Sequence, residues 1–189
     1  MNWTKEDLVY LRSLRGVVDS DNIKIKEQIK QELATNKYIA HVLHNIELES
    51  MNASPDEYFN VNIFPYYIIS PTQHNVNHFI CYETSFTELD RYNRTEKYMD
   101  IYFYILCHEK DAIDSETGLA RHDLLAALIT DQFNWTNLFG KKVHLVEDKA
   151  GVTDEDYASR TLIFQQVTDN TLVKTKNSVS RLANKDVVV

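Results

Sequence analysis

Apolar side chains recur at helical spacing over the first fifty residues. Thr4 followed by Asp7 is typical of a helix start, and the next leucines share one stripe: Leu8, Leu11 and Leu14. A second helix is predicted over about residues 23–33, with an inner face of Ile25, Ile29 and Leu33. Asn36 is a candidate cap for a third helix, whose inner face would be Ile39, Val42, Leu43 and Ile46.

The middle of the chain alternates in the manner of β-strands. Residues 64–69 form an aromatic approach to a strand that ends before Pro71, and residues 78–84 are a second candidate. Residues 98–108 give the strongest strand pattern, because apolar or aromatic side chains occupy both of its faces. The polar residues 90–96 predict a hairpin between these two strands. We expect residues 98–108 to be a central strand covered on both faces.

One long helix and a closing hairpin complete the pattern. Residues 119–133 place Leu124, Leu125, Leu128, Ile129 and Phe133 on one face, whereas Arg121, Asp123 and Asp131 are expected to face solvent. Residues 142–147 and 160–166 predict two strands, separated by an acidic turn at 148–156. After Asn170 the hydrophobic period fades.

The order of these elements predicts an α+β fold. N-terminal helices would be followed by a mixed, mainly antiparallel β-sheet that is packed by one long helix. The length of 189 residues suits one domain, at residues 1–170, and residues 171–189 would be an extended basic C-terminal arm. The four glycines never lie near one another, so no glycine-loop nucleotide site can be written.

Charge separates the arm from the body. Residues 1–170 contain 16 Lys and Arg against 27 Asp and Glu, a net of −11, whereas residues 171–189 carry a net of +3. An acidic body argues against a face that grips nucleic acid, and no apolar run approaches the ~20 residues of a membrane span. Two cysteines in apolar runs, Cys81 and Cys107, predict buried free thiols in a reducing compartment.

Candidate chemistry is sparse. His41 and His44 lie three residues apart on a predicted helix, a spacing that can hold a metal, but zinc sites need three or four ligands. Asp111, Asp114 and Glu116 precede a predicted helix, where acids satisfy free N–H groups and the helix dipole. We therefore expect no enzyme activity, no cofactor and no resident metal.

One part of the chain has a familiar order of elements. It runs from Asp111 through Gly118 and the Arg121-His122-Asp123 triplet to Ile129, and it continues with residues 133–135, Phe139-Gly140 and two strands. Over about residues 22–168 the chain resembles small head–tail connection proteins of long-tailed bacteriophages, most nearly the tail-terminator type. The aromatic stretch at residues 58–69 and the tail after Asn170 have no counterpart in that pattern.

This resemblance implies a structural virion protein at the phage neck, made in the cytoplasm of the bacterial host. Tail terminators form a ring, usually a homohexamer, that caps the tail tube and meets the head connector, and DNA passes through the ring without specific binding. The 21 aromatic residues suit protein–protein interfaces, although aromatic side chains fill cores equally well.

Two segments are the candidate functional residues of such a ring. Acids that could face the channel are Asp148, Asp154, Glu155 and Asp156. The arm that could reach a neighbouring protein carries Lys174, Lys176, Arg181 and Lys185 and ends in Val187, Val188 and Val189. The alternatives are another neck protein (a head-completion or stopper ring), a minor tail protein and, more distantly, a metal-dependent hydrolase that uses His41 and His44.

Overall fold

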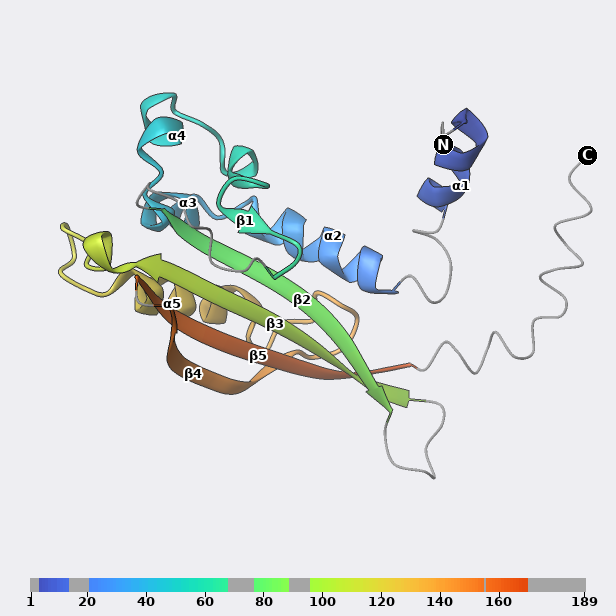
Figure 1. Ribbon diagram of the computed structural model, residues 1–189. Helices are drawn as coiled ribbons and strands as arrows, with labels where there is room; N and C mark the ends of the chain where they lie inside the picture. Colours follow the sequence, from blue (N-terminus) through green and yellow to red (C-terminus); the bar gives the residue numbers. More distant parts are fainter. Residues whose placement is uncertain (1–3, 14–20, 68–76, 89–95, 155, 170–189) are drawn as a thin grey trace, which may run out of the picture.

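The structure is a computed structural model that describes residues 4–13, 21–67, 77–88, 96–154 and 156–169. Its helices are α1 (Lys5–Ser13), α2 (Asp21–Leu33), α3 (Lys37–Leu43), α4 (Ile46–Ser50) and α5 (Arg121–Phe133), with 3-10 helices η3 (Pro55–Tyr58) and η4 (Glu109–Asp111). Its strands are β1 (Ile63–Phe64), β2 (His78–Glu88), β3 (Glu96–His108), β4 (His144–Asp154) and β5 (Tyr157–Asp169). The fold is α+β with N-terminal helices, as the sequence predicts (Figure 1).

The five strands form one mixed sheet in the order β1-β2-β3-β5-β4. Only the β1–β2 pair is parallel; β2–β3, β3–β5 and β4–β5 are antiparallel. The predicted hairpin of residues 78–84 and 98–108 is confirmed, and β3 is the central strand with Ile80 opposite Ile105 and Tyr104 opposite Thr161.

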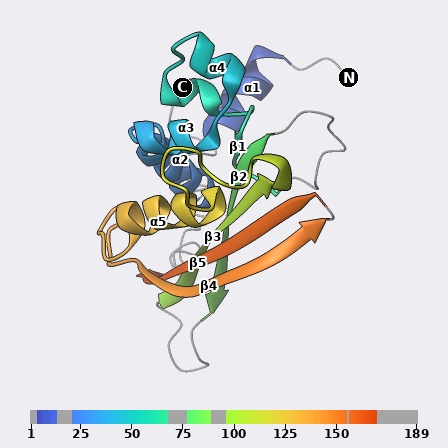
Figure 2. The ribbon, with the colours of Figure 1, turned by 90° about the vertical axis from the view of Figure 1, so that its left-hand side faces the viewer.

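Helices cover one face of this sheet, which we call the inner face. Helices α2, α3 and α5 lie on that side (Figure 2). Alternate residues of β3 and β5 point into the core there, and Phe103, Phe133 and Phe164 are fully buried with ring centroids 5.1–6.3 Å apart. The predicted packing of α5 is confirmed: Leu125, Ile129 and Phe133 are buried, while Leu124 and Leu128 are partly buried against the same core.

The opposite face, which we call the outer sheet face, differs from the prediction. We expected β3 to be covered on both sides, and the outer side is covered in part: Leu106 is buried there in a small cluster with Phe79 and Tyr157. No helix of the described residues lies over the rest of the outer side of β3 and β5 (Figure 2). Its side chains include Tyr98, Tyr102, Tyr104, Ile163 and Val167, which all remain partly exposed. The alternation alone could not reveal this, because it reports apolar character and not what covers it.

Two boundaries also differ from the sequence-based expectations. The third helix ends at Leu43, because His44 adopts a left-handed conformation with φ 46°, and Ile46 starts the separate helix α4 with 73% of its surface exposed. The predicted acidic turn at 148–156 is instead mostly strand, since β4 continues to Asp154 and β5 starts at Tyr157. In the described part of the chain, no helix has the length and apolar character needed to cross a membrane.

Candidate functional site

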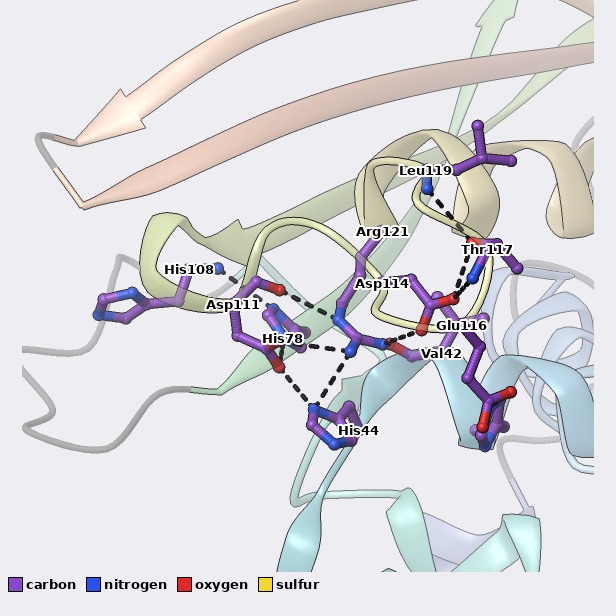
Figure 3. Close-up of polar contacts among 11 residues, drawn as sticks. Val42, His44, His78, His108, Asp111, Asp114, Glu116, Thr117, Leu119 and Arg121 are labelled. Atoms are coloured by element: carbon purple, nitrogen blue, oxygen red, sulfur yellow. Dashed lines mark hydrogen bonds and ion pairs between the residues drawn. The ribbon is translucent and has the colours of Figure 1, made fainter.

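A cluster of hydrogen-bonded polar and charged side chains surrounds Arg121, the first residue of α5 (Figure 3). We expected this side chain to face solvent, but it is only 3% exposed. Its guanidinium donates to the backbone carbonyls of Asp111 and Val42, at 3.0 and 3.3 Å. It also pairs with the carboxylates of Asp111 at 3.4 Å and Asp114 at 3.1 Å. A buried arginine therefore joins α3, α5 and the connection from β3 to α5.

Asp111 brings two histidines to the same place. Its Oδ2 atom lies 2.5 Å from Nδ1 of His44, the residue that ends α3, and 3.1 Å from Nε2 of His78, the first residue of β2. Because Nδ1 of His78 accepts a hydrogen bond from the His108 backbone N–H at 3.2 Å, its proton resides on Nε2 and is donated to Asp111. We call Arg121, Asp111, Asp114, His44 and His78 the arginine cluster.

Burial and charge set the protonation states of the arginine cluster. Burial lowers the pKa of His78, with the Arg121 and His44 charges acting in the same direction, while the contact with Asp111 opposes the shift. Burial acts to raise the pKa of Asp111, but the hydrogen bonds from His44 and His78 and the charges of Arg121 and His44 together hold it below its ordinary value. The pKa of Asp114 is lowered chiefly by hydrogen bonds from Thr117, whose N–H and hydroxyl lie 2.9 and 2.7 Å away.

This chemistry is that of a structural clamp. The sequence led us to expect that Asp111 and Asp114 would satisfy the N-terminus of α5, but they do not. The cap residue of α5 is Ala120, which makes no side-chain cap bond. His41, the other member of the predicted metal pair, is 55% exposed in its side chain and lies 3.6 Å from Glu116, away from His44. Among the described residues, no group of three or more His, Cys, Asp and Glu side chains is arranged to hold a metal ion.

The outer sheet face is the second candidate site, and it is aromatic. Tyr102 and Tyr104 stack with ring centroids 6.2 Å apart, and Tyr67 meets the edge of Tyr104 at 5.0 Å. A shallow hollow of about 290 Å³ lies beside these rings and is lined by Tyr67, Tyr104, Leu106, Ser159, Arg160 and Thr161. Burial also raises the pKa of Tyr104. Partly exposed tyrosine side chains are typical of protein–protein interfaces.

The acids predicted to face a channel take different positions. Asp148 on β4 binds Arg160 of β5 through two hydrogen bonds of 2.6 and 2.9 Å, and Arg160 also pairs with Asp123 of α5. Asp156 is exposed at the β4–β5 turn, and Asp154 ends β4 beside it. Glu155 and all of the proposed arm residues, 171–189, lie outside the described residues. The structure thus groups the acids around one hairpin, with the charge of Asp148 already matched by an arginine.

Both predicted free cysteines are confirmed as buried: Cys81 and Cys107 are fully enclosed, and burial raises the pKa of the Cys107 thiol strongly. Sequence reasoning missed the arginine cluster because its members are distant in the chain. The sequence does contain one indication of the cluster. Arg121 stands at a helix start, and Asp111 and Asp114 precede it by ten and seven residues.

The described part of the chain is therefore an α+β domain with a helix layer on one sheet face and a partly exposed aromatic surface on the other. Residues 24–166, about three quarters of the chain, match the family model YomW. The protein belongs to this family, which is named after a gene of a Bacillus phage region, and it is phage-related. No curated protein matches the chain.

Proposed function

We propose that the protein is a tail-terminator-like ring subunit of the phage neck, which caps the tail tube and joins it to the head connector. The outer sheet face carries this proposal. An antiparallel sheet that faces water on one side normally shows polar residues there. This face does carry Ser85, Asp100 and Gln165, but it also presents a set of partly exposed aromatic and aliphatic side chains: Tyr98, Tyr102, Tyr104, Ile163 and Val167. Neighbouring subunits of a ring would remove these side chains from water.

Membership in a phage-related family and the earlier resemblance to head–tail connection proteins support the same role. A ring subunit needs two contact surfaces, each burying about 800 Å² for a standard stable interface. We propose a homohexamer that contacts the tail tube protein on one side and the head connector on the other, in a virion, with no catalytic role.

Particles made without this protein test the role directly. We expect heads and tails that fail to join, or tails of uncontrolled length, and electron microscopy would show either defect. A second neck protein, such as a head-completion or stopper ring, would leave tail length normal and heads unfinished. Normal joining of heads and tails in the absence of the protein would contradict the proposal.

One substitution tests the surface that carries the proposal. Ile163→Asp places a charge on the outer sheet face at a partly exposed position of β5, and we expect folded subunits that fail to enter particles. Met51→Asp is the matched control, because Met51 is 70% exposed beyond α4 and far from this face in the chain. Equal incorporation of both variants would exclude the outer sheet face as a subunit contact.

The metal-dependent hydrolase is the distant alternative. It would require a stoichiometric transition metal that is lost from His44→Ala. Metal analysis of the purified protein separates the two functions, and we expect no such metal because Arg121 Nη2 lies 3.3 Å from His44 Nδ1, where a cation would be repelled.

A further inference from the structure

The two edge strands of the sheet differ in length and therefore in how well they can pair with a further strand. At one edge β1 is two residues long. At the other, β4 extends over 11 residues and, among the described residues, pairs with β5 on one side. A strand with unpaired N–H and C=O groups on its outer side is a template for a further strand.

The central part of β4 is the regular part of this edge. Register shifts occur between Leu145 and Glu147 and between Val152 and Asp154, so Glu147–Val152 is an uninterrupted stretch of ladder opposite Ala158–Ile163. Every residue from 146 to 152 is exposed, and Val152 is 79% exposed. Bulges protect both ends of this strand, but its middle stays open to pairing.

Residues 171–189 have the composition of a strand that this edge would accept. They carry Lys174, Lys176, Arg181 and Lys185 against Asp186, and they end in three consecutive valines. The remainder of the chain has a net charge of −11, and β4 contributes Glu147 and Asp154 against Lys149, while Asp148 is already paired with Arg160. Charge therefore favours approach of the segment, and β-branched residues favour strand pairing once it arrives.

We propose that residues 171–189 of one copy add a strand to the β4 edge of the neighbouring copy, along Glu147–Val152. Main-chain hydrogen bonds would supply the affinity and alternate side chains the specificity, as in other cases of β-strand addition. The inference rests on the proposed ring, because it names the contact that links one subunit to the next. Fully extended, 19 residues span at most about 65 Å, which is ample for a neighbour in a ring.

The chain's own β4 is a poorer acceptor for topological reasons. Strand β5 ends at Asp169, and Gln165 pairs with His144, so the segment leaves the sheet at the end where β4 begins. To reach the outer side of its own β4, it would have to cross the connection that brings residues 134–143 into that strand. Connections that cross at one end of a sheet are rare.

Disulfide cross-linking between two single variants tests the proposal. One variant carries Val188→Cys and the other carries Lys149→Cys or Ala150→Cys, which sample both sides of β4. The natural thiols do not interfere, since Cys81 and Cys107 are fully buried. The two variants are produced together in cells making phage particles, and the particles are then oxidised. A control pairs Val188→Cys with Met51→Cys, which is exposed away from the edge.

We expect about ten-fold more covalent dimer with the edge variants than with the control, because docking raises the effective concentration of the two thiols. Dimer no more abundant than in the control would overturn the inference. A double variant that cross-links only within one chain, seen as loss of thiols without dimer, would overturn it in favour of self-pairing. In either case normally joined particles would leave the ring function standing, whereas absence of the protein from particles would overturn both.

Discussion

Arg121 shows how a single residue fixes the arrangement of several elements. Its guanidinium meets two carboxylates and two backbone carbonyls while its side chain is only 3% exposed. Asp114 is buried and Asp111 is partly buried, and the guanidinium is the cation that pairs with both carboxylates. The helix layer therefore depends on this ion pair for its position against the end of the sheet.

Removal of this guanidinium should destabilise the fold strongly. Arg121→Met leaves Asp111 and Asp114 without their cation, and breaking a buried pair in this way costs about 3–5 kcal/mol. Arg160→Met is the comparison, because that side chain is 26% exposed and its ion pairs are worth about 1 kcal/mol. Urea unfolding of the two variants measures the difference. A loss at Arg121 no larger than that at Arg160 would contradict the clamp.

His78 predicts a pH dependence of stability. Its pKa is lowered from the ordinary 6.5 by burial, so the unfolded chain binds a proton that the folded protein does not. The free energy of unfolding should therefore fall as the pH drops below 6.5, by up to about 1.4 kcal/mol per pH unit. Asp111, whose pKa is lowered from 3.8, adds a second loss below that value.

Urea unfolding between pH 7.5 and pH 5 measures this slope, and His78→Gln is the variant to compare. Glutamine keeps a hydrogen-bonding side chain but does not titrate, so the slope near pH 6 should flatten. His122→Gln is the control, since His122 is partly exposed at the start of α5 and lies outside the arginine cluster. An unchanged slope in His78→Gln would assign the pH dependence to another group.

At the scale of elements, helix α5 is held by a narrower face than its leucines suggest. Leu125 is fully buried, whereas Leu128 is partly buried at the margin of the core. Leu125→Ala should therefore cost about 2–5 kcal/mol, and Leu128→Ala about 1–2 kcal/mol. Thermal unfolding of the two variants tests the order. Equal or reversed losses would mean that α5 is rotated relative to the sheet.

The helices and strands that the sequence predicts well are those in which the hydrophobic pattern continues over many residues. Helices α2 and α5 and strands β2 and β3 have repeated apolar positions over seven or more residues, and each was placed within a few residues of its observed bounds. The predicted bounds are wrong where the backbone conformation or a strand partner overrides the hydrophobic pattern. His44 turns into the left-handed region and splits the third helix, and β4 continues through polar residues because β5 supplies its ladder partners.

The candidate sites were harder to predict, for a related reason. The arginine cluster joins residues 44, 78, 111, 114 and 121, which meet only after α3, β2 and the β3–α5 connection have packed. An alternating strand such as β3 shows that both faces are apolar, but it cannot show that one face lacks a covering element. Both features belong to tertiary structure.

At the scale of the whole molecule, the two surfaces of the sheet have separate roles. The inner face and the arginine cluster hold the helices against the sheet through contacts within one chain. The outer sheet face and the β4 edge are adjacent through β5, which pairs with both β3 and β4. A neighbour that donates a strand to β4 would thus lie close to the aromatic rings of β3, and one contact would bury both.

The charge of the assembled ring leads to the last prediction. In the proposed hexamer, six copies with a formal net charge of −8 each would carry −48, and we expect part of this charge to line the proposed DNA channel. Among the acids proposed for that wall, Asp148 is matched by Arg160, which leaves the exposed Asp156 as the best candidate among the described residues. Asp156→Lys should slow DNA ejection and make it more sensitive to salt, because each added lysine can bind phosphate. Asp131→Lys makes the same charge change at an exposed position of α5 and is the control. Ejection from particles carrying each variant, measured at several salt concentrations, gives the comparison. Equal rates for both variants, or a ring structure whose channel wall is basic, would exclude an acidic channel formed by the β4–β5 turn.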